Sequence, residues 1–524
     1  MKIAIIGAGV AGLTSAKVLT QAGHQVRVYD KAPDVGGVWS RTRRYPGVTT
    51  QSPKAQYSLS DFPMPAHYPE WPDGAQIQAY FAAYAEHFGL DRVLRLGTEV
   101  TAARPDGSGG WLVESRPTGT DAGTGTSTGT GTAEAETFDR LVVANGIFCE
   151  PAVPAYPGLD EFTAAGGRLC AGTEFHEVED ARDRRVLVVG YGKSACDVAV
   201  AIGQVAASTD VIARQMLWKV PRKINGIVNF KLLLLTRLGE ALFRYLRPGG
   251  VERFLHGPGK GLRGKMINSI GTVSIRQFGL DKLGLVPEGQ MEDIVRGAIG
   301  LATEGFFEGV ADGTLTVHRD RTVVRLFAAD GRPSAELSDG STLPADLVVC
   351  ATGFTQEVPF LPEEVRERVT DERGNYLLYR QIRPVDVPGL YFNGYNSSFF
   401  SPLNAEMAAV WIAGDLGGLV PLPAPEAMRE AVVEQLAFMD EALDRHHSRG
   451  AKIIPYSLHN ADEVLGDLGL NISTPVRAWH WLGPVNPAAY RRVTPELLKR
   501  LRAQQAAVPP KPDHAPLTPT RAAR

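Results

Sequence analysis

Two stretches of the chain share one pattern: IAIIGAGVAGLTSA at residues 3–16 and VLVVGYGKSACDVAV at residues 186–200. In each, a short apolar run ends at closely spaced glycines, and a helical pattern of small and apolar residues follows. A further apolar run comes after each helix, QVRVY at 25–29 and DVIAR at 210–214. The sequence therefore predicts two β-α-β units about 180 residues apart, which is typical of the α/β fold class with Rossmann-like domains.

The first turn carries Gly7, Gly9 and Gly12 with the spacing G-x-G-x-x-G. In this pattern the first glycine allows a tight turn, the second lets a pyrophosphate approach the backbone, and the third lets helix and strand pack closely. The free N–H groups at the helix start favour phosphate. Asp30 ends the next strand, where a carboxylate accepts hydrogen bonds from a ribose and disfavours a 2′-phosphate. We therefore expect FAD or NAD here.

The second turn carries Gly190 and Gly192, and small Ala195 takes the third position. The following strand ends at Arg214, which can pair with a 2′-phosphate and so indicates NADPH. Lys193 is a second candidate for phosphate. The alternative is that both cations are solvated surface residues. The two turns together predict two dinucleotides, FAD at the first and NADPH at the second.

The composition sets limits on the remaining possibilities. The chain has 524 residues, 44% of them apolar and 22% charged, which is enough for two or three domains. Its net charge of −3 gives no reason to expect nucleic acid or an anionic membrane as a partner. Its 4 cysteines form no C-x-x-C pair, which argues against a disulfide framework, a zinc knuckle and a dithiol redox centre, and we expect no metal site. The N-terminus enters a strand at once and no run of about 18 apolar residues occurs, so we expect no signal peptide, no transmembrane segment and a cytoplasmic location.

Outside the two turns, periodicity predicts a few further elements. Helices are expected at 11–22, 75–88, 231–246 and 404–419, and strands at 111–115, 138–144, 346–350 and 389–392. The Gly/Thr-rich run PTGTDAGTGTSTGTGT from residue 117 is expected to be a loop. The helix at 231–246 has three open interpretations: a core-facing helix, which we favour, a wall of a substrate entrance, or a membrane-surface helix.

Nine short motifs follow one another along most of the chain. They are GAGVAG (7–12), GGVW (36–39), YPG (45–47), VVANG (142–146), VVGYGKSACDVA (188–199), LLLLTRLGEALF (232–243), VVCATGF (348–354), GLYFNGY (389–395) and LGPVNPAAYRR (482–492). In this order they resemble the motifs of the flavin-containing monooxygenases, which are class B flavoprotein monooxygenases.

The resemblance implies an NADPH-binding domain inserted into a split FAD-binding domain. The ranges expected are FAD domain 1–157 and 328–450, NADPH domain 158–327 with a helical insert at about 217–300, C-terminal extension 451–502 packing on the FAD domain, and disordered tail 503–524. Within this frame, the run ATGF (351–354) marks where the chain returns toward the FAD domain.

The resemblance also implies the cofactor contacts. For FAD they are Gly7, Gly9, Gly12, Asp30, Gly37, Val38 and Trp39, and for NADPH they are Gly190, Gly192, Ser194 and Arg214, to which we add Lys193 as the candidate named above. A helix that starts near Asn404 would aim its N–H groups at the flavin pyrimidine ring, where they stabilise reduced flavin. The alternative for Asn404 is a plain helix cap.

The implied reaction is oxygenation of a small organic substrate. NADPH reduces FAD, molecular oxygen forms a C4a-(hydro)peroxyflavin, and oxygen passes to nitrogen or sulfur. The alternatives are Baeyer–Villiger oxygenation of a ketone, an NADPH oxidase or reductase without oxygen transfer, and a non-catalytic nucleotide-binding scaffold. A homo-oligomer stays open. Richness in Ala, Arg, Gly and Pro suggests a GC-rich genome and a role in secondary metabolism.

Two positions depart from the family pattern. Gln51 stands where nitrogen- and sulfur-oxidising members carry an active-site asparagine, so it is our candidate catalytic residue. Compared with asparagine, glutamine has the same amide and one more methylene. The alternative interpretation of Gln51 is a polar surface residue. Cys170 stands where the family has a histidine, and we interpret it as buried packing rather than a reactive thiol.

Overall fold

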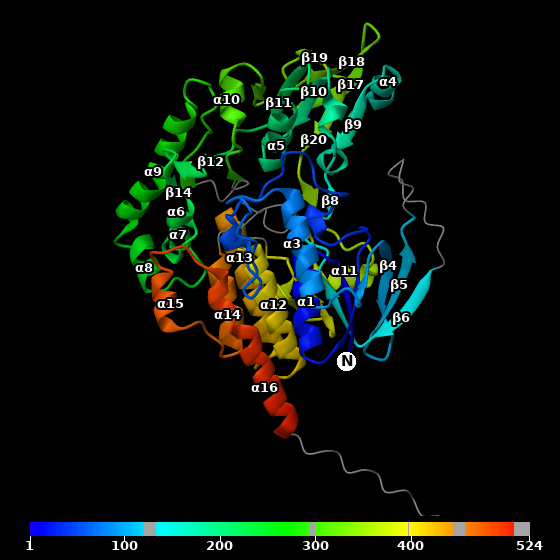
Figure 1. The fold of residues 1–524 in the computed structure, drawn as a ribbon, viewed down its shortest axis with the longest axis vertical. Helices are drawn as coiled ribbons and strands as arrows, with labels where there is room; N and C mark the ends of the chain where they lie inside the picture. Colours follow the sequence, from blue (N-terminus) through cyan, green and yellow to red (C-terminus); the bar gives the residue numbers. More distant parts are fainter. Residues whose placement is uncertain (120–132, 293–299, 397, 444–455, 508–524) are drawn as a thin grey trace, which may run out of the picture.

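The chain folds into two lobes, each built on a parallel sheet with a smaller antiparallel sheet beside it (Figure 1). The computed structural model describes residues 1–119, 133–292, 300–396, 398–443 and 456–507. Among these residues no helix combines the length and apolarity needed to cross a bilayer.

The first lobe is centred on a 5-stranded parallel sheet in the order β24-β7-β1-β2-β3. Its strands are β1 (Lys2–Ile6), β2 (Gln25–Tyr29), β3 (Leu94–Arg95), β7 (Arg140–Val143) and β24 (Leu390–Phe392). Helices α1 (Val10–Gln21), α3 (Gly74–His87) and α12 (Ser401–Leu416) pack with it, and the antiparallel sheet is β4 (Thr98–Pro105), β5 (Trp111–Pro117) and β6 (Glu134–Phe138). Since β24 pairs with β7, this lobe is built from two distant parts of the chain.

The second lobe repeats the design with the strand order β16-β11-β10-β20-β9. Its strands are β9 (Arg168–Ala171), β10 (Arg185–Val189), β11 (Ser208–Ala213), β16 (Thr316–Arg319) and β20 (Leu347–Cys350). Around them lie α4 (Leu159–Ala164), α5 (Lys193–Ile202), α10 (Phe306–Ala311) and the antiparallel strands β17 (Val323–Ala329), β18 (Arg332–Leu337) and β19 (Thr342–Pro344). The parallel-sheet α/β fold predicted from the sequence is therefore confirmed.

One predicted domain limit is wrong. The sequence interpretation returned the chain to the first lobe at residue 328, but β18, β19 and β20 all belong to the second lobe. An apolar run such as DLVVC fits the centre of either sheet, so its composition does not tell which sheet it joins. The chain leaves the first lobe through β8 (Glu150–Pro151) and returns through β21 (Phe354–Thr355), and these two strands pair antiparallel. We therefore propose the ATGF motif at 351–354 as the return point, in place of residue 328.

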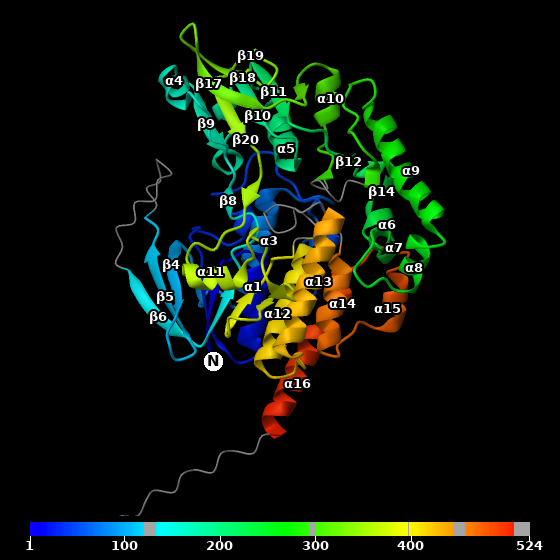
Figure 2. The same ribbon diagram turned by 180° about the vertical axis from the view of Figure 1, so that it is seen from behind.

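A helical insert lies between β11 and β16. It holds the paired strands β12 (Lys219–Val220) and β15 (Gly300–Leu301), the hairpin β13 (Lys223–Ile224) and β14 (Val228–Asn229), and helices α6 (Lys231–Leu234), α7 (Arg237–Ala241), α8 (Gly250–His256) and α9 (Lys260–Phe278). The C-terminal part supplies α13 (Pro425–Leu443), α14 (Ser457–Asp467), α15 (Thr474–Trp479) and α16 (Val493–Ala507). The two groups of helices lie side by side in both views (Figures 1 and 2).

A buried ionic cluster fastens the insert to the C-terminal helices. The imidazole of His459 lies between Glu240 and Glu252, with N–O distances of 2.5 and 2.6 Å. Burial lowers the pKa of His459, but the hydrogen bonds to the two carboxylates outweigh this and raise it to about 10. Arg237 adds a bidentate pair with Asp462 at 2.7 and 2.9 Å. We call these five residues the clamp.

Three element predictions need correction. The helix expected at 231–246 is two short helices, α6 and α7, because Thr236 Oγ1 accepts the N–H of Gly239 and starts a new helix. The helix expected at 404–419 begins earlier, at Ser401. The tail expected from residue 503 begins with the last residues of α16, which ends at Ala507. Residues 120–132 of the Gly/Thr-rich run and the tail after residue 507 lie outside the described residues.

Candidate active site

The first glycine turn is closely packed. Gly7 has φ of 111°, and a Cβ there would lie 2.3 Å from the carbonyl oxygen of Ala144. A Cβ on Gly12 would lie 1.8 Å from the carbonyl oxygen of Gly7, so no other residue fits without moving the backbone. Gly9 precedes α1, whose first turn has no side-chain cap. The free N–H groups at this helix start are available to a phosphate.

The GGVW motif lies against this turn. A Cβ on Gly37 would come within 3.1 Å of the Cα of Gly9, so the two glycines leave a cradle that side chains would fill. Val38 is 37% exposed beside it. Trp39 is buried instead, and its indole N–H donates to the hydroxyl of Tyr57 at 3.0 Å. The cradle lies where the sequence predicts the pyrophosphate of FAD, and Trp39 supports it from the core.

Asp30 follows β2 and faces the same turn. Its carboxylate accepts the N–H groups of Ala8 at 2.6 Å and Ala32 at 2.8 Å. Burial raises the pKa of Asp30, and these backbone N–H groups act against that rise. The residue predicted to hold a ribose therefore also fixes the turn, and each oxygen keeps a lone pair for a ligand.

The second turn is more open. Gly190 has φ of 127°, and a Cβ there would lie 2.5 Å from the carbonyl oxygen of Ala351. A Cβ on Gly192 would meet nothing within 4 Å. Gly192 precedes α5, which has no side-chain cap, so this helix start is also free for phosphate. The hydroxyl of Ser194 donates to the hydroxyl of Tyr45 at 2.9 Å, which links this turn to the first lobe.

Lys193 lies at this turn with its ammonium group already occupied. It donates to Asp197 at 2.5 Å and to Thr49 at 3.4 Å. Burial lowers the pKa of Lys193, against the attraction of Asp197. Thr303 donates to the same carboxylate at 2.6 Å. Both sequence interpretations of Lys193, a phosphate ligand or a solvated cation, missed this buried ion pair, although Asp197 stands one helical turn away at i+4.

Arg214 lies at the carboxyl edge of the second sheet, directly after β11. The N–H of Gly190 donates to Ile212 at 2.9 Å, so Arg214 is beside the glycine turn. It is exposed, and it forms no hydrogen bond or ion pair with the residues that the structure describes. This is the residue at which the sequence predicts a contact with the 2′-phosphate of NADPH.

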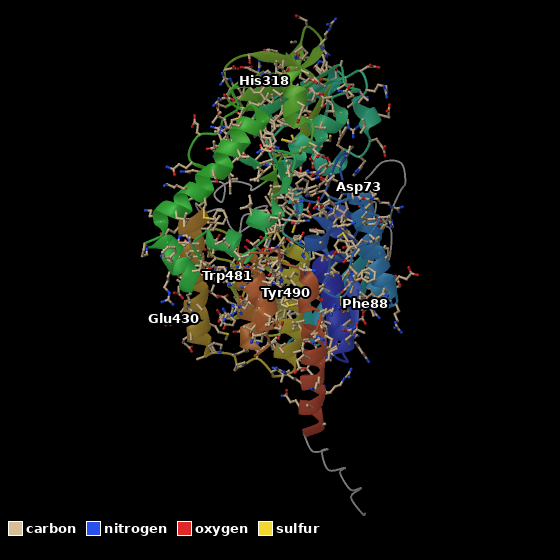
Figure 3. The ribbon with its side chains drawn as sticks, turned by 60° about the vertical axis from the view of Figure 1, so that its left-hand side comes forward. Asp73, Phe88, His318, Glu430, Trp481 and Tyr490 are labelled. Atoms are coloured by element: carbon tan, nitrogen blue, oxygen red, sulfur yellow. The ribbon has the colours of Figure 1, made fainter. Side chains whose placement is uncertain are left out.

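Gln51 lies where the two lobes meet. Its Oε1 accepts the N–H of Leu301, at the end of the helical insert, at 3.3 Å. Two residues earlier, Thr49 pairs by its backbone with Asp73 at the start of α3, which Figure 3 labels near the junction of the lobes. The next residue, Ser52, donates to the carbonyl of Phe399, which precedes α12. The segment at 49–52 therefore touches α3, the insert and the approach to α12.

Arg222 is a residue of this junction that the sequence analysis missed. Its side chain is 10% exposed, it donates to Thr49 at 2.6 Å, and its guanidinium lies 5.2 Å over the ring of Trp71. Its Nε has no hydrogen-bond partner among the described residues. Burial lowers its pKa. No periodicity marks this arginine in the run VPRK, so only the folded arrangement reveals it.

Asn404 is buried inside α12 and is not its cap. The helix begins at Ser401, and the side chain of Asn404 donates to Ser398 at 2.7 Å. The alternative of a plain cap is therefore wrong. The loop that Asn404 holds follows Asn393, whose amide donates to the carbonyl of Ala11 in α1 at 3.2 Å. The start of α12 thus lies beside the first glycine turn.

Cys170 is buried in β9, and burial raises its pKa to about 11. This agrees with a packing role and confirms the interpretation made from the sequence.

An apolar cavity lies between the insert and the first lobe. Its walls are Val220, Leu234, Gly239, Glu240, Leu242, Phe243, Ile267, Ile270, Met291, Phe399, Phe400 and Ser457. Gln51 is next to two of these walls, because Leu301 pairs with Val220 and Ser52 bonds to Phe399. The carboxylate of Glu240, one of the few polar groups here, is already held by His459.

Comparison with known proteins shows which family the chain resembles. The model of the flavin-binding monooxygenase-like family matches residues 1–256. The chain is similar to the flavin-containing monooxygenases, over this region by the family model and along most of its length by curated relatives. It is therefore an enzyme, a flavin-dependent monooxygenase, and its cofactors are FAD and NADPH.

Sequence alignments with relatives extend over nearly the whole chain. A probable flavin-containing monooxygenase 1 of Arabidopsis thaliana is 27% identical over 90% of this chain and 92% of its own length. Dimethylaniline monooxygenase [N-oxide-forming] 4 of Oryctolagus cuniculus is 27% identical over 94% of this chain and 85% of its own length.

Solved structures show the same fold. S-allyl-L-cysteine S-oxygenase from Allium sativum superposes with a TM-score of 0.60 at 18% identity, covering 97% of this chain and 99% of that one. Cyclohexanone monooxygenase from Rhodococcus sp. Phi1, bound to NADP+, superposes with a TM-score of 0.63 at 18% identity, covering 89% and 97%.

Proposed function

We propose that this flavoenzyme uses NADPH and molecular oxygen to oxygenate a small, mainly apolar substrate at nitrogen or sulfur. The observation that carries the proposal is Gln51, an amide held at the lobe junction by Leu301 and next to an apolar cavity. Because its oxygen is occupied, its Nε2 is left as a hydrogen-bond donor. Two relatives support the choice of atom, since one is named as N-oxide-forming and one structural neighbour as an S-oxygenase.

The residues of the two turns would hold the cofactors. The cradle of Gly9 and Gly37, with the start of α1 and Asp30, fits FAD, and the start of α5 with Arg214 fits NADPH. Bound FAD, once reduced by NADPH, supplies the activation of oxygen. The protein positions the two cofactors, donates a hydrogen bond from Gln51 and keeps the neighbouring cavity free of water through its apolar walls.

A second candidate is oxygenation of a ketone, and Arg222 is the observation that favours it. A buried guanidinium at the junction stabilises negative charge nearby, which is what attack on a carbonyl carbon requires of the oxidant.

The test is one assay with three substrate classes. The purified yellow enzyme is reduced by NADPH without oxygen and then mixed with oxygenated buffer containing an aryl sulfide, a tertiary amine or a cyclic ketone. A sulfoxide or N-oxide formed in proportion to NADPH supports the proposal, and an ester or lactone supports the second candidate. Stoichiometric hydrogen peroxide with every substrate, and prompt return of the oxidised-flavin absorbance, would mean an oxidase and contradict both.

A further inference from the structure

Lys219 is a buried lysine that lies outside all the motifs found in the sequence. It comes from β12, at the start of the helical insert, and it is only 3% exposed. Its ammonium group forms no ion pair with a carboxylate among the residues that the structure describes. A buried charge is costly unless it is compensated, and lysine is seldom fully buried without a partner. This lysine therefore needs a physical explanation.

The ammonium group of Lys219 is held by Tyr191, which lies inside the second glycine turn. It donates to the carbonyl oxygen of Tyr191 at 2.8 Å and lies 4.5 Å from the centre of the tyrosine ring. Tyr191 is itself buried against Phe306, with the ring centres 5.8 Å apart. In Figures 1 and 2, β12 lies between α9 and α5. The insert thus contributes a side chain to the turn that precedes α5.

This contact fixes the direction of one backbone N–H. The carbonyl of Tyr191 and the N–H of Gly192 share a trans peptide plane, so they point in opposite directions. Because the carbonyl points inward to Lys219, the N–H of Gly192 points away from the core. A Cβ on Gly192 would meet nothing within 4 Å, so a ligand can approach the backbone here. The direction of this N–H is the one that binding of a phosphate at the start of α5 requires.

Lys219 also adds to an excess of buried positive charge around this turn. Lys193, in the same turn, is paired with the buried carboxylate of Asp197. Arg222, which follows β12, is paired with Glu304, whose side chain is 82% exposed. Two of these three buried cations therefore have no buried counter-charge among the described residues. Such a site favours an anionic ligand, because electrostatic attraction is strong where water is excluded.

We propose that Lys219 is a positioning residue for the pyrophosphate of NADPH. It acts through Tyr191, whose carbonyl it holds so that the N–H of Gly192 faces the ligand, and it adds a positive charge behind the turn. The pyrophosphate is common to NADPH and NADH, whereas only NADPH has the 2′-phosphate expected at Arg214. Lys219 therefore strengthens the binding of both nucleotides and leaves the choice between them to Arg214.

The experiment measures ligand binding by calorimetry, with the full-length, FAD-loaded protein and two fragments of the nucleotide. ADP-ribose carries the pyrophosphate without a 2′-phosphate, and 2′-AMP carries a 2′-phosphate without the pyrophosphate. We expect Lys219→Met to raise the Kd for ADP-ribose about tenfold and to change that for 2′-AMP less than about twofold. Arg214→Ala should do the reverse.

A second variant separates the hydrogen bond from the charge. Lys219→Gln keeps a donor for the carbonyl of Tyr191 and loses the charge, so we expect a rise of about threefold in the Kd for ADP-ribose. Neither variant should lower the midpoint of thermal unfolding without nucleotide, because each removes a buried charge that no carboxylate compensates. FAD content, read from flavin absorbance, should stay at the wild-type level.

Lys17→Met is the matched control in the first lobe. Lys17 is 1% exposed and lies 4.7 Å from the ring centre of Phe88, which Figure 3 labels, but it is paired with Asp61 and Glu406. Its replacement should lower the unfolding midpoint and leave the Kd for ADP-ribose within about twofold.

Three results would overturn the proposal. The first is a Kd for ADP-ribose within about twofold of wild type in both Lys219 variants. The second is an equal loss of affinity for ADP-ribose and 2′-AMP, which would mean a general disturbance of the lobe. The third is a lower unfolding midpoint with unchanged affinity, which would assign Lys219 to packing alone.

Discussion

The two glycine turns have the same strand-turn-helix plan and differ in how much of each is fixed before any cofactor arrives. At the first, Gly12 admits no Cβ, Asp30 is bonded to the turn itself, and Gly37 closes against Gly9. At the second, Ala195 replaces the third glycine, Gly192 faces open space and Arg214 is unpaired among the described residues. A preformed site loses less entropy when its ligand binds. The first turn therefore suits a cofactor that stays bound, and the second turn suits a cofactor that exchanges.

The largest expected effect comes from alanine at the most closely packed glycine of the first turn, compared with alanine at the open glycine of the second. Gly12→Ala forces a Cβ to 1.8 Å from a backbone oxygen, so we expect a loss of about 4 kcal/mol or more in the free energy of unfolding and no retained FAD. Gly192→Ala has space and a negative φ, so FAD content and unfolding should stay near wild type. Thermal unfolding and flavin absorbance measure both. Equal effects of the two changes would remove the distinction.

The second prediction concerns the ion pair beneath the open turn. Lys193→Met leaves the buried carboxylate of Asp197 without its closest cation, and we expect a loss of about 3 kcal/mol in the free energy of unfolding at pH 8. Burial raises the pKa of Asp197 and Lys193 counteracts that rise, so removal of Lys193 should raise the pKa of the folded state further above that of the unfolded chain. Its deficit should therefore grow as pH rises above about 4.

The double variant Lys193→Met/Asp197→Leu is the control for that pair. It removes both charges and should recover most of the lost free energy of unfolding and flatten its pH dependence. If the single variant unfolds like wild type at every pH, the pair does not hold the turn.

The sequence predicts those parts of the site that are formed by residues close together in the chain. Glycine spacing, the acid after β2 and the arginine after β11 are local patterns, and the structure brings each of them to the carboxyl edge of its sheet. Arg222 and the cavity depend on segments hundreds of residues apart, and no period in the sequence encodes such contacts. The single helix expected at 231–246 failed because one threonine cap outweighs helical spacing.

The third prediction asks whether the open turn selects its cofactor by charge. Arg214→Ala should raise the KM for NADPH about 30-fold, or about 2 kcal/mol, because a charge-assisted hydrogen bond to the 2′-phosphate is lost. The KM for NADH is the internal control and should change less than about twofold. Steady-state reduction with both nucleotides measures this. Equal rises in the two KM values would assign the phosphate to another cation.

The smallest expected effect lies between the turns, at Gln51. Gln51→Asn withdraws the amide by one methylene and breaks the 3.3 Å contact with Leu301, a loss of about 1 kcal/mol. We expect about fivefold less oxygenated product per NADPH, with the difference released as peroxide, and an unchanged rate of anaerobic reduction. A changed reduction rate with unchanged coupling would place Gln51 at hydride transfer instead.

The clamp also determines which parts of the enzyme keep their relative positions. In sequence the helical insert belongs to the second lobe, yet Arg237, Glu240 and Glu252 fasten it to α14. A rotation of the second sheet would have to bend the chain at β8 and β21 and again on both sides of the insert. The cavity is lined by the insert, the approach to α12 and the start of α14, which all lie on the clamped side. The clamp thus holds the walls of the cavity together independently of the contacts that join the second glycine turn to the first lobe.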